Sequence, residues 1–344
     1  MKNKLISFYK KNKKKIFSFL RIIISVSLIA FLIKTQFKDI QSAIKILKMI
    51  NIPWLILSAS THVFGIWITA IRWKTLLQTQ KINLNTRFLT STVLIGFFFN
   101  NFLPSTIGGD VFRTYDVAKK TNKPLGTSGS VIVVERFSGV ISAATYAIVA
   151  LFLGFTAIGG QSVIIPIIIF FVICIILAFL ILNPSILRLE KLVKKIKFLE
   201  KLKQKLSNVY NTFLSFKKYK MVLTKILIYS FLLQFAVILN YYLAAKALGI
   251  NLSLTSFIFI VPVVATIAMI PISIGGIGLR ENSLVYIMVA MGVNNEEAAL
   301  CSLILFAMLI FIGIIGGITY SIRPYFSNYI SKKEISKIKT NQNI

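Results

Sequence analysis

The sequence predicts an all-α, polytopic membrane protein with about six to eight transmembrane helices, built as two inverted repeats that each contain a re-entrant broken helix. Three observations support this prediction. Hydrophobic residues make up 56% of the 344 residues, and the mean hydropathy is +0.79. Several apolar runs approach the roughly 20 residues needed to span hydrocarbon. Two motifs containing proline and glycine interrupt apolar segments at matching places in the two halves of the chain.

Apolar segments follow one another along almost the whole chain. The candidate membrane helices fall at 16–33, 53–71, 88–103, 131–154, 162–183, 220–247, 255–272 and 298–322, with a shorter run at 283–293. The first segment has a basic start but no small-residue cleavage site, so we expect a retained helix rather than a removed signal peptide.

The central connector, residues 184–219, is rich in lysine. Its Leu192, Ile196 and Leu199 begin a series of apolar residues that recur every three or four positions beneath a basic face. This pattern is typical of a helix on the membrane surface, and a short soluble helical hairpin is the alternative. The predicted organisation is a basic tail at 1–15, one integral membrane domain at 16–322 with repeats at about 53–183 and 220–322, and a basic tail at 323–344.

The distribution of charge predicts the orientation. The chain has 40 Lys and Arg against 10 Asp and Glu, and the cations concentrate in the tails, in 72–87 and in the connector, whereas 155–161 and 248–254 are uncharged. Cytoplasmic loops are enriched in Lys and Arg, so we predict a multi-pass protein of the cell membrane with both termini in the cytoplasm. Anionic lipid headgroups are the expected partners of the basic surface. Nucleic acid is not, because the basic residues form no stripe on a folded soluble face.

The cysteines and the histidine give no sign of a metal or a cofactor. Cys174 and Cys301 each lie alone in an apolar run, and His62 has no Cys, His or acid at ligand spacing. We therefore expect no disulfide framework, no metal site and no cofactor.

An internal duplication is predicted by two pairs of matching segments. "PSTIGGDVFR" (104–113) and "PISIGGIGLR" (271–280) share Pro, Ile, Gly, Gly and Arg in register, 167 residues apart. Upstream, "INLN" (82–85) matches "INLS" (250–253) at an offset of 168 residues. Two matches at nearly one offset favour a duplication over chance.

The charge pattern requires the two copies to be inverted. If 88–103 and 255–272 were ordinary spans, the basic connector would lie outside the cell. Both segments are therefore predicted to dip into the membrane and return, which places the first copy's loop inside and the second copy's loop outside. Segment 34–52 does not fit this predicted orientation well, because it carries four lysines on the predicted outer side.

The two breaks are predicted to form anion cradles. Proline ends a helix, and the glycine pairs permit turns that other residues avoid. A helix that starts after Gly109 or Gly276 would direct free N–H groups and its positive end at an anion. Arg113 and Arg280 follow about one turn later, where a guanidinium can bind phosphate through two hydrogen bonds. Helix packing with an interfacial arginine is the alternative interpretation.

Charged residues also lie near the ends of other predicted helices. Glu135 and Arg136 fall in the first turn or two of a predicted span, where ionisable residues are costly, and we interpret them as functional or as an ion pair that supports the cradle. Arg72 with Trp73 ends a predicted helix, where an interfacial anchor is the favoured interpretation and a functional role is the alternative.

Three stretches carry a resemblance to a known family. "NNFLPSTIGGDVFRTYDVAKK", "VVERFSGV" and "PISIGGIGLRENSLVYIMV", in this order, resemble the flippase-like membrane domain of the lysylphosphatidylglycerol synthase family, over about 16–322. Known members couple this domain to movement of aminoacylated phospholipids, and relatives occur beside polyprenyl-lipid and glycolipid chemistry. The substrate-binding positions implied are Asn101, Pro104, Gly108, Gly109, Asp110, Arg113, Glu135, Arg136, Pro271, Gly275, Gly276, Gly278, Arg280 and Glu281. The soluble aminoacyl-transfer domain has no counterpart here, so synthase activity is not expected.

These observations favour a lipid translocator for a phosphate-bearing phospholipid or a polyprenyl-linked lipid. Inverted repeats with broken helices are a transporter architecture, and no nucleotide-binding loop indicates an ATP motor. Asp110, Glu135 and Glu281 are candidate proton carriers. The alternatives are a membrane-embedded transferase with Asp110 or Glu135 as general base, and an accessory subunit for a separately encoded lipid-modifying enzyme.

Overall fold

The computed structural model describes residues 2–37, 40–102, 108–152, 216, 218–268, 270 and 272–341. The predicted span at 162–183, the connector up to residue 215, Pro104 and Pro271 lie outside these ranges. All structural statements below concern the described residues.

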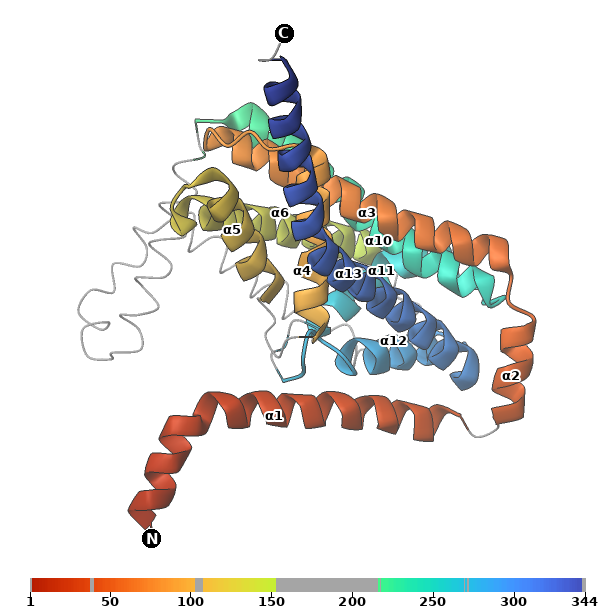
Figure 1. The fold of residues 1–344 in the computed structure, drawn as a ribbon. Helices are drawn as coiled ribbons and strands as arrows, with labels where there is room; N and C mark the ends of the chain where they lie inside the picture. The colour runs from red at the N-terminus through yellow and green to blue at the C-terminus, as the bar shows by residue number, and fades with distance from the viewer. Residues whose placement is uncertain are drawn as a thin grey trace, which may run out of the picture.

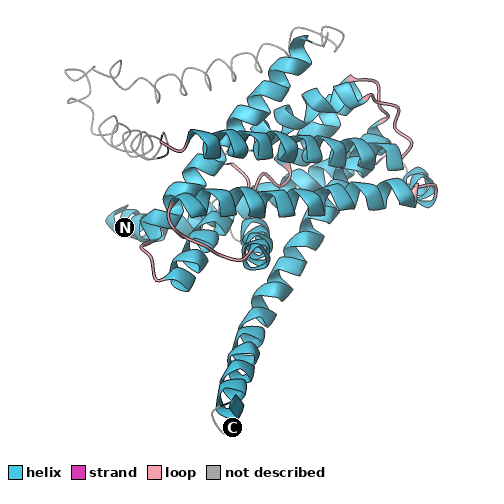
Figure 2. Cartoon of the chain, turned by 90° about the horizontal axis from the view of Figure 1, so that it is seen from above, coloured by secondary structure: helices cyan, strands magenta, loops and turns pink. Residues whose placement is uncertain are grey.

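The described chain consists of α-helices joined by loops and contains no strand (Figure 2). The helices are α1 (Lys2–Gln36), α2 (Ile40–Lys48), α3 (Ile52–Thr79), α4 (Thr86–Phe102), α5 (Gly108–Thr121), α6 (Leu125–Phe152), α10 (Lys220–Ala247), α11 (Leu254–Ala268), α12 (Leu279–Ala290) and α13 (Asn295–Asn341) (Figure 1). The segments long and apolar enough to cross a membrane are Phe19–Gln36, Ile52–Thr79, Leu125–Val149, Lys220–Ala247 and Asn295–Arg323. The predicted class, an all-α polytopic membrane protein, is confirmed.

Helices α3 and α10 lie side by side and form an antiparallel pair (Figure 1). Asn51, which caps α3, donates its backbone N–H to the Ala247 carbonyl at the end of α10, over 2.8 Å. Inside the pair, the Asn240 amide donates to the Ser58 carbonyl (2.8 Å), and the Ser58 hydroxyl donates to the Asn240 carbonyl (2.8 Å). This buried reciprocal contact satisfies polar groups that hydrocarbon would leave unpaired, so it fixes the register of the two helices.

Helices α4 and α5 form a hairpin that begins and ends at the C-terminal end of α3. The Lys74 ammonium donates to the Thr86 hydroxyl at the start of α4, over 3.1 Å. The Lys123 ammonium, just after α5, donates to the Gln80 carbonyl (2.7 Å) and the Lys81 carbonyl (3.0 Å). The chain thus enters the bundle along α4 and returns along α5 to the end from which it started.

Helices α11 and α12 form a second hairpin at the opposite end. Ile250 precedes α11 and Val293 follows α12, and both belong to the buried apolar cluster that includes the end of α10. Asn294 also lines a cavity of about 280 Å³ together with Ile46 of α2, the helix that precedes Asn51 and α3. The two hairpins therefore open toward opposite ends of the α3–α10 pair, which is the geometry that inverted copies require. The duplication itself stays a prediction.

The tips of the hairpins meet inside the bundle. A Cβ atom built on Gly275 would lie 3.1 Å from the Asn100 carbonyl oxygen near the end of α4. Gly275 has a φ of +56°, which side chains rarely adopt, so glycine is required here for both conformation and space. The two interrupted segments are direct neighbours.

Helix α13 packs closely on α4 through three glycines, Gly313, Gly316 and Gly317. A Cβ on Gly316 would overlap the Leu94 carbonyl oxygen, and a Cβ on Gly317 would lie 2.9 Å from the Phe98 ring. Small residues let membrane helices approach in this way, and the contact positions the first hairpin.

Opposite hairpin openings lead to a labelling prediction. Asn85 precedes α4, Ser253 precedes α11, and both are exposed. In a background with Cys174→Ser and Cys301→Ala, we expect an impermeant maleimide added to intact cells to label Ser253→Cys. Asn85→Cys should react only after the membrane is permeabilised, because the charge distribution predicts that the basic side faces the cytoplasm. Labelling of both positions from the same side would contradict the arrangement.

Candidate functional site

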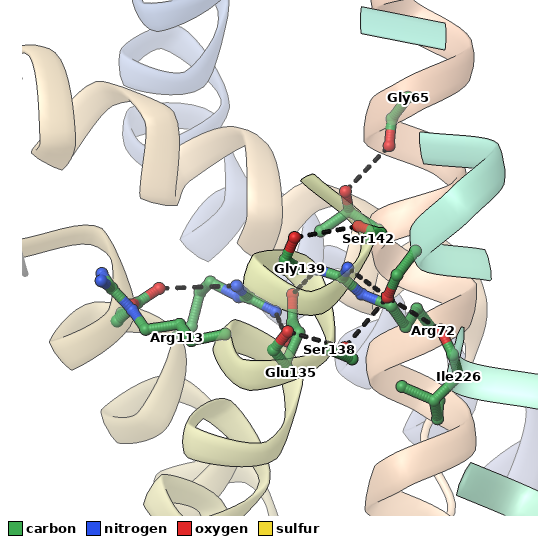
Figure 3. A network of polar contacts seen from close by, with 12 residues as sticks. Gly65, Arg72, Arg113, Glu135, Ser138, Gly139, Ser142 and Ile226 are labelled. Carbon is green, nitrogen blue, oxygen red and sulfur yellow. Dashed lines mark hydrogen bonds and ion pairs between the residues drawn. The ribbon is translucent and has the colours of Figure 1, made fainter. Parts of the chain in front are cut away.

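A buried carboxylate on α6 joins two arginines from other helices. Glu135 is 3% exposed, and its Oε1 accepts from Arg72 Nη2 of α3 over 2.8 Å while its Oε2 accepts from Arg113 Nη2 of α5 over 2.7 Å. Figure 3 shows Glu135 between the two guanidinium groups. Because α6 begins at Leu125, Glu135 lies in about its third turn, deeper than the sequence predicted.

Further polar and aromatic contacts hold the two arginines. Arg72 Nη1 donates to the Ser230 hydroxyl of α10 over 3.0 Å, and this hydroxyl lies 2.9 Å from that of Ser138. The Arg113 guanidinium lies over the Trp73 ring, 4.3 Å from its centroid. Helices α3, α5, α6 and α10 are thereby linked through one network.

The network continues toward the surface through Asp110 and Arg136. Asp110 Oδ1 lies 3.5 Å from Arg113 Nη1, and Asp110 Oδ2 accepts from both Nε and Nη2 of Arg136 over 2.5 Å. The side-chain exposure rises from 9% at Arg113 through 15% at Asp110 to 57% at Arg136. The ion cluster, defined as Arg72, Arg113, Arg136, Asp110 and Glu135, therefore reaches from the buried interior to the exterior.

The ion cluster carries a surplus of positive charge. Its three guanidinium groups face two carboxylates, Asp110 and Glu135. Asp110 also lies in the first turn of α5, where the helix dipole favours a negative charge. One uncompensated positive charge in a partly buried setting attracts an anion more strongly than the same charge in water.

The second break has a different, electrically neutral arrangement. Arg280 donates to Glu281 Oε1 from Nε (2.9 Å) and Nη2 (2.5 Å), and Glu281 Oε2 accepts from the Gly278 N–H (2.6 Å). Helix α12 begins at Leu279, later than the predicted start after Gly276. Gly276 and Gly278 adopt φ values of +80° and +84°, which are not helical. Gly278 also packs against Leu28, which brings this break onto α1.

The predicted site residues thus divide into groups. Asp110, Arg113, Glu135 and Arg136 meet in the ion cluster, and the second break brings together Gly275, Gly276, Gly278, Arg280 and Glu281. Gly108 and Gly109 start α5, and Asn101 donates to the Leu309 carbonyl of α13 over 2.9 Å. Pro104 and Pro271 lie outside the described residues.

Two helix-start amides that were expected to face an anion have acceptors within the protein. Gly109 N–H donates to the Asn100 side-chain oxygen over 2.8 Å, and Gly278 N–H donates to Glu281. Gly109 also packs so closely on Gly96 and Asn100 that no Cβ fits. In this conformation the guanidinium groups of the ion cluster, rather than these two amides, are the prominent anion-binding groups.

Sequence reasoning missed Arg72. It was interpreted as an interfacial anchor, and this was wrong, because Arg72 is 6% exposed and pairs with Glu135. Its partners lie 63 and 158 residues away in the sequence, so no local spacing indicated them. The sequence did contain one indication, the carboxylate of Glu135 inside an apolar segment. The adjacent Arg136 points to a different face of the helix, so the partner of Glu135 had to come from elsewhere in the chain.

An ion pair at the basic end was also missed. Arg323 of α13 donates to Asp116 of α5 (2.7 Å) and to Thr92 of α4 (3.1 Å), and its guanidinium lies 4.0 Å from the Phe88 ring centroid. This contact joins α13 to both helices of the first hairpin. A mainly apolar groove of about 400 Å³ also lies along α4 and α13, lined by Phe98, Phe102, Ile318 and their neighbours.

Comparison with known proteins decides the family. The family model described as the lysylphosphatidylglycerol synthase TM region matches residues 18–317. The chain belongs to this family. Its membership agrees with the resemblance inferred from the two breaks and the Glu135 segment, and with the multi-pass helical structure.

Curated relatives of the family cover most of the chain. A UPF0104 membrane protein of Pyrococcus horikoshii is 26% identical over 300 residues, which cover 81% of this chain and 89% of the relative. A UPF0104 membrane protein of Methanocaldococcus jannaschii is 24% identical over 335 residues, which cover 92% and 96%. No solved structure matches the chain. Among the described residues, no three His, Cys, Asp or Glu side chains are grouped as a metal site.

Proposed function

We propose that the protein moves the headgroup of a phosphate-bearing phospholipid or polyprenyl-linked lipid across the cell membrane, with its termini in the cytoplasm. The observation that supports this most is the ion cluster, which holds a surplus positive charge and extends from buried Glu135 to exposed Arg136. Guanidinium groups bind phosphate through paired, charge-assisted hydrogen bonds. The cluster is therefore suited to receive a lipid phosphate from the surface.

The opposed hairpins supply the second part of the argument. Each interrupted segment carries an arginine, Arg113 or Arg280, and the two hairpins open toward opposite ends of the bundle. Charged groups at membrane depth are costly and tend to mark substrate pathways. Two such groups near adjoining hairpin tips provide successive polar positions for a headgroup, while the acyl chains remain in hydrocarbon.

An apolar position for the lipid tail lies on the same hairpin. The groove along α4 and α13 is lined by Phe98, Phe102 and Ile318, next to the break that follows α4. Burial of a hydrocarbon chain in such a groove is favourable but weakly specific. We therefore assign headgroup selection to the ion cluster and tail accommodation to the groove.

A transferase is the weaker candidate. A general base must be able to take a proton from substrate, yet Glu135 accepts from two guanidinium groups and Asp110 accepts from Arg136. Both carboxylates are engaged as counterions. An accessory subunit for a separately encoded enzyme could also bind lipid. It would not move lipid between leaflets, so the assay below distinguishes it from a translocator.

A liposome assay tests the proposal. Purified protein is reconstituted with a fluorescent phospholipid, and movement between leaflets is followed by dithionite quenching. We expect Arg113→Ala and Arg280→Ala to slow movement at least about tenfold, because each loses a phosphate-binding guanidinium. Arg113→Lys keeps the charge but loses the forked geometry, so it should also be slow.

The control is Arg87→Ala, which removes an exposed arginine at the start of α4 that has no ion pair among the described residues. It should leave the rate unchanged. Equal rates in the wild type and in all variants would contradict the site, and a wild-type rate no higher than that of protein-free liposomes would contradict lipid movement.

A further inference from the structure

We infer that Asp110 is a resident counterion occupying the position of a lipid phosphate between Arg113 and Arg136, and that the phosphate displaces it on binding. This inference rests on the proposed function and deepens it by assigning the position at which the lipid phosphate binds. The sequence placed Asp110 among the substrate-binding residues, whereas the geometry assigns it the role of a competitor for the substrate.

The contacts of Asp110 are those of a substitute anion. Its Oδ2 receives two donors from Arg136 over 2.5 Å, and its Oδ1 lies 3.5 Å from Arg113 Nη1. The second distance is too long for a hydrogen bond, so Arg113 is only loosely satisfied on this side. The short Asp110 side chain thus engages Arg136 closely but reaches Arg113 incompletely. A phosphate group, which offers more acceptor oxygens, can bind both.

Unsatisfied donors around the cluster point independently to a missing acceptor. Arg113 Nε, Arg72 Nε and Trp73 Nε1 are buried and have no hydrogen-bond partner in the described structure. Trp73 is fully buried and its ring lies against the Arg113 guanidinium. Buried donors without acceptors are rare and destabilising, so the unpaired Nε of Arg113, whose guanidinium lies beside Asp110, supports binding of a further acceptor there.

The charge balance selects the chemical class of that acceptor. The ion cluster holds three guanidinium groups and two carboxylates, which leaves one positive charge. A lipid phosphate is attracted to this surplus. When the phosphate displaces Asp110, three guanidinium groups face Glu135 alone, so two positive charges remain for the bound anion to neutralise. The cluster therefore selects an anionic lipid phosphate over an uncharged headgroup.

This exchange of a carboxylate for a phosphate is confined to the first hairpin. The position of the second motif that corresponds to Asp110 is Ile277, which cannot act as a counterion. Arg280 is instead neutralised by Glu281, which also binds the Gly278 N–H and is 1% exposed. Glu281 is fixed in place by these contacts, while Asp110 lies nearer to the surface, where its side chain can exchange with an arriving phosphate.

A binding experiment tests the inference without requiring lipid movement. The probe is a short-chain, fluorescently labelled phosphatidylglycerol, and its binding to the full-length protein in nonionic detergent is followed by fluorescence anisotropy. Asp110→Asn removes the competing charge and keeps the side-chain size, so we expect the dissociation constant to fall about tenfold. The matched control is Asp116→Asn, the same change on the same helix at an aspartate that pairs with Arg323, and it should not tighten binding.

Displacement of the labelled probe from the wild-type protein by unlabelled lipids provides a second measurement, which does not depend on the folding of a variant. Unlabelled phosphatidylglycerol and phosphatidic acid should both displace the probe, and a diacylglycerol without phosphate should not displace it. Unchanged or weaker binding by folded Asp110→Asn, or equal displacement by diacylglycerol, would overturn the inference. A wild type that binds the probe but moves no lipid would refute the proposed function alone, so the two failures are distinguishable.

Discussion

Replacing Glu135 by glutamine is expected to lower the free energy of unfolding by about 3–5 kcal/mol. The side chain is 3% exposed and is the shared counterion of Arg72 and Arg113. Glutamine keeps the size but removes the charge, so two buried guanidinium groups lose their shared counterion and Arg113 retains only Asp110, 3.5 Å away. The measurement is thermal unfolding of the detergent-solubilised protein, monitored by intrinsic fluorescence.

Two further variants make this prediction specific. Glu296→Gln, at the start of α13, removes a carboxylate that has no ion pair among the described residues and should change the melting temperature little. Adding Arg72→Met to Glu135→Gln removes one of the two stranded charges and should restore part of the lost stability. A melting temperature equal to that of the wild type for Glu135→Gln would show that the network does not hold the four helices together.

The second large effect is expected for Glu281→Ala, again about 3–5 kcal/mol. Glu281 is the buried partner of Arg280, and it also accepts the Gly278 N–H at the start of α12. Alanine leaves Arg280 without its counterion and the helix start without its cap. Both losses act on the tip of the second hairpin, so lipid movement should fall together with stability.

The matched comparison separates the two contributions of Glu281. Glu281→Gln keeps an acceptor for the Gly278 N–H but loses the charge, so it should be less destabilising than Glu281→Ala and should still leave Arg280 unpaired. Equal stability of the alanine variant and the wild type, measured by the same unfolding assay, would contradict a structural role for the pair.

Much of the fold was predictable because it depends on local patterns. Long apolar runs predicted the helices α3 and α10, though not their pairing, and the glycines predicted where α5 begins. The break before α12 was placed correctly, but its helix start was placed too early, because the conformation of Gly278 depends on packing against Leu28 of α1. A contact between residues 250 positions apart leaves no local trace in the sequence.

The ion cluster was predictable only in part. Arg113, Glu135 and Asp110 stood out because charges inside apolar segments are costly. Arg72 lies at the end of an apolar run, where an arginine usually anchors at the interface, and only the three-dimensional arrangement brings it to Glu135. The same reason applies to Arg323 and Asp116, which are distant in sequence and meet because α13 packs on α4.

The contact between Gly275 and the Asn100 carbonyl has a mechanical consequence for both hairpins. Because packed protein interiors are nearly incompressible, a displacement of α4 toward this contact pushes the loop before α12 in the same direction. Withdrawal of one loop leaves space for the other to follow. The two hairpins are therefore coupled through this contact, so a shift of one tip is transmitted to the other.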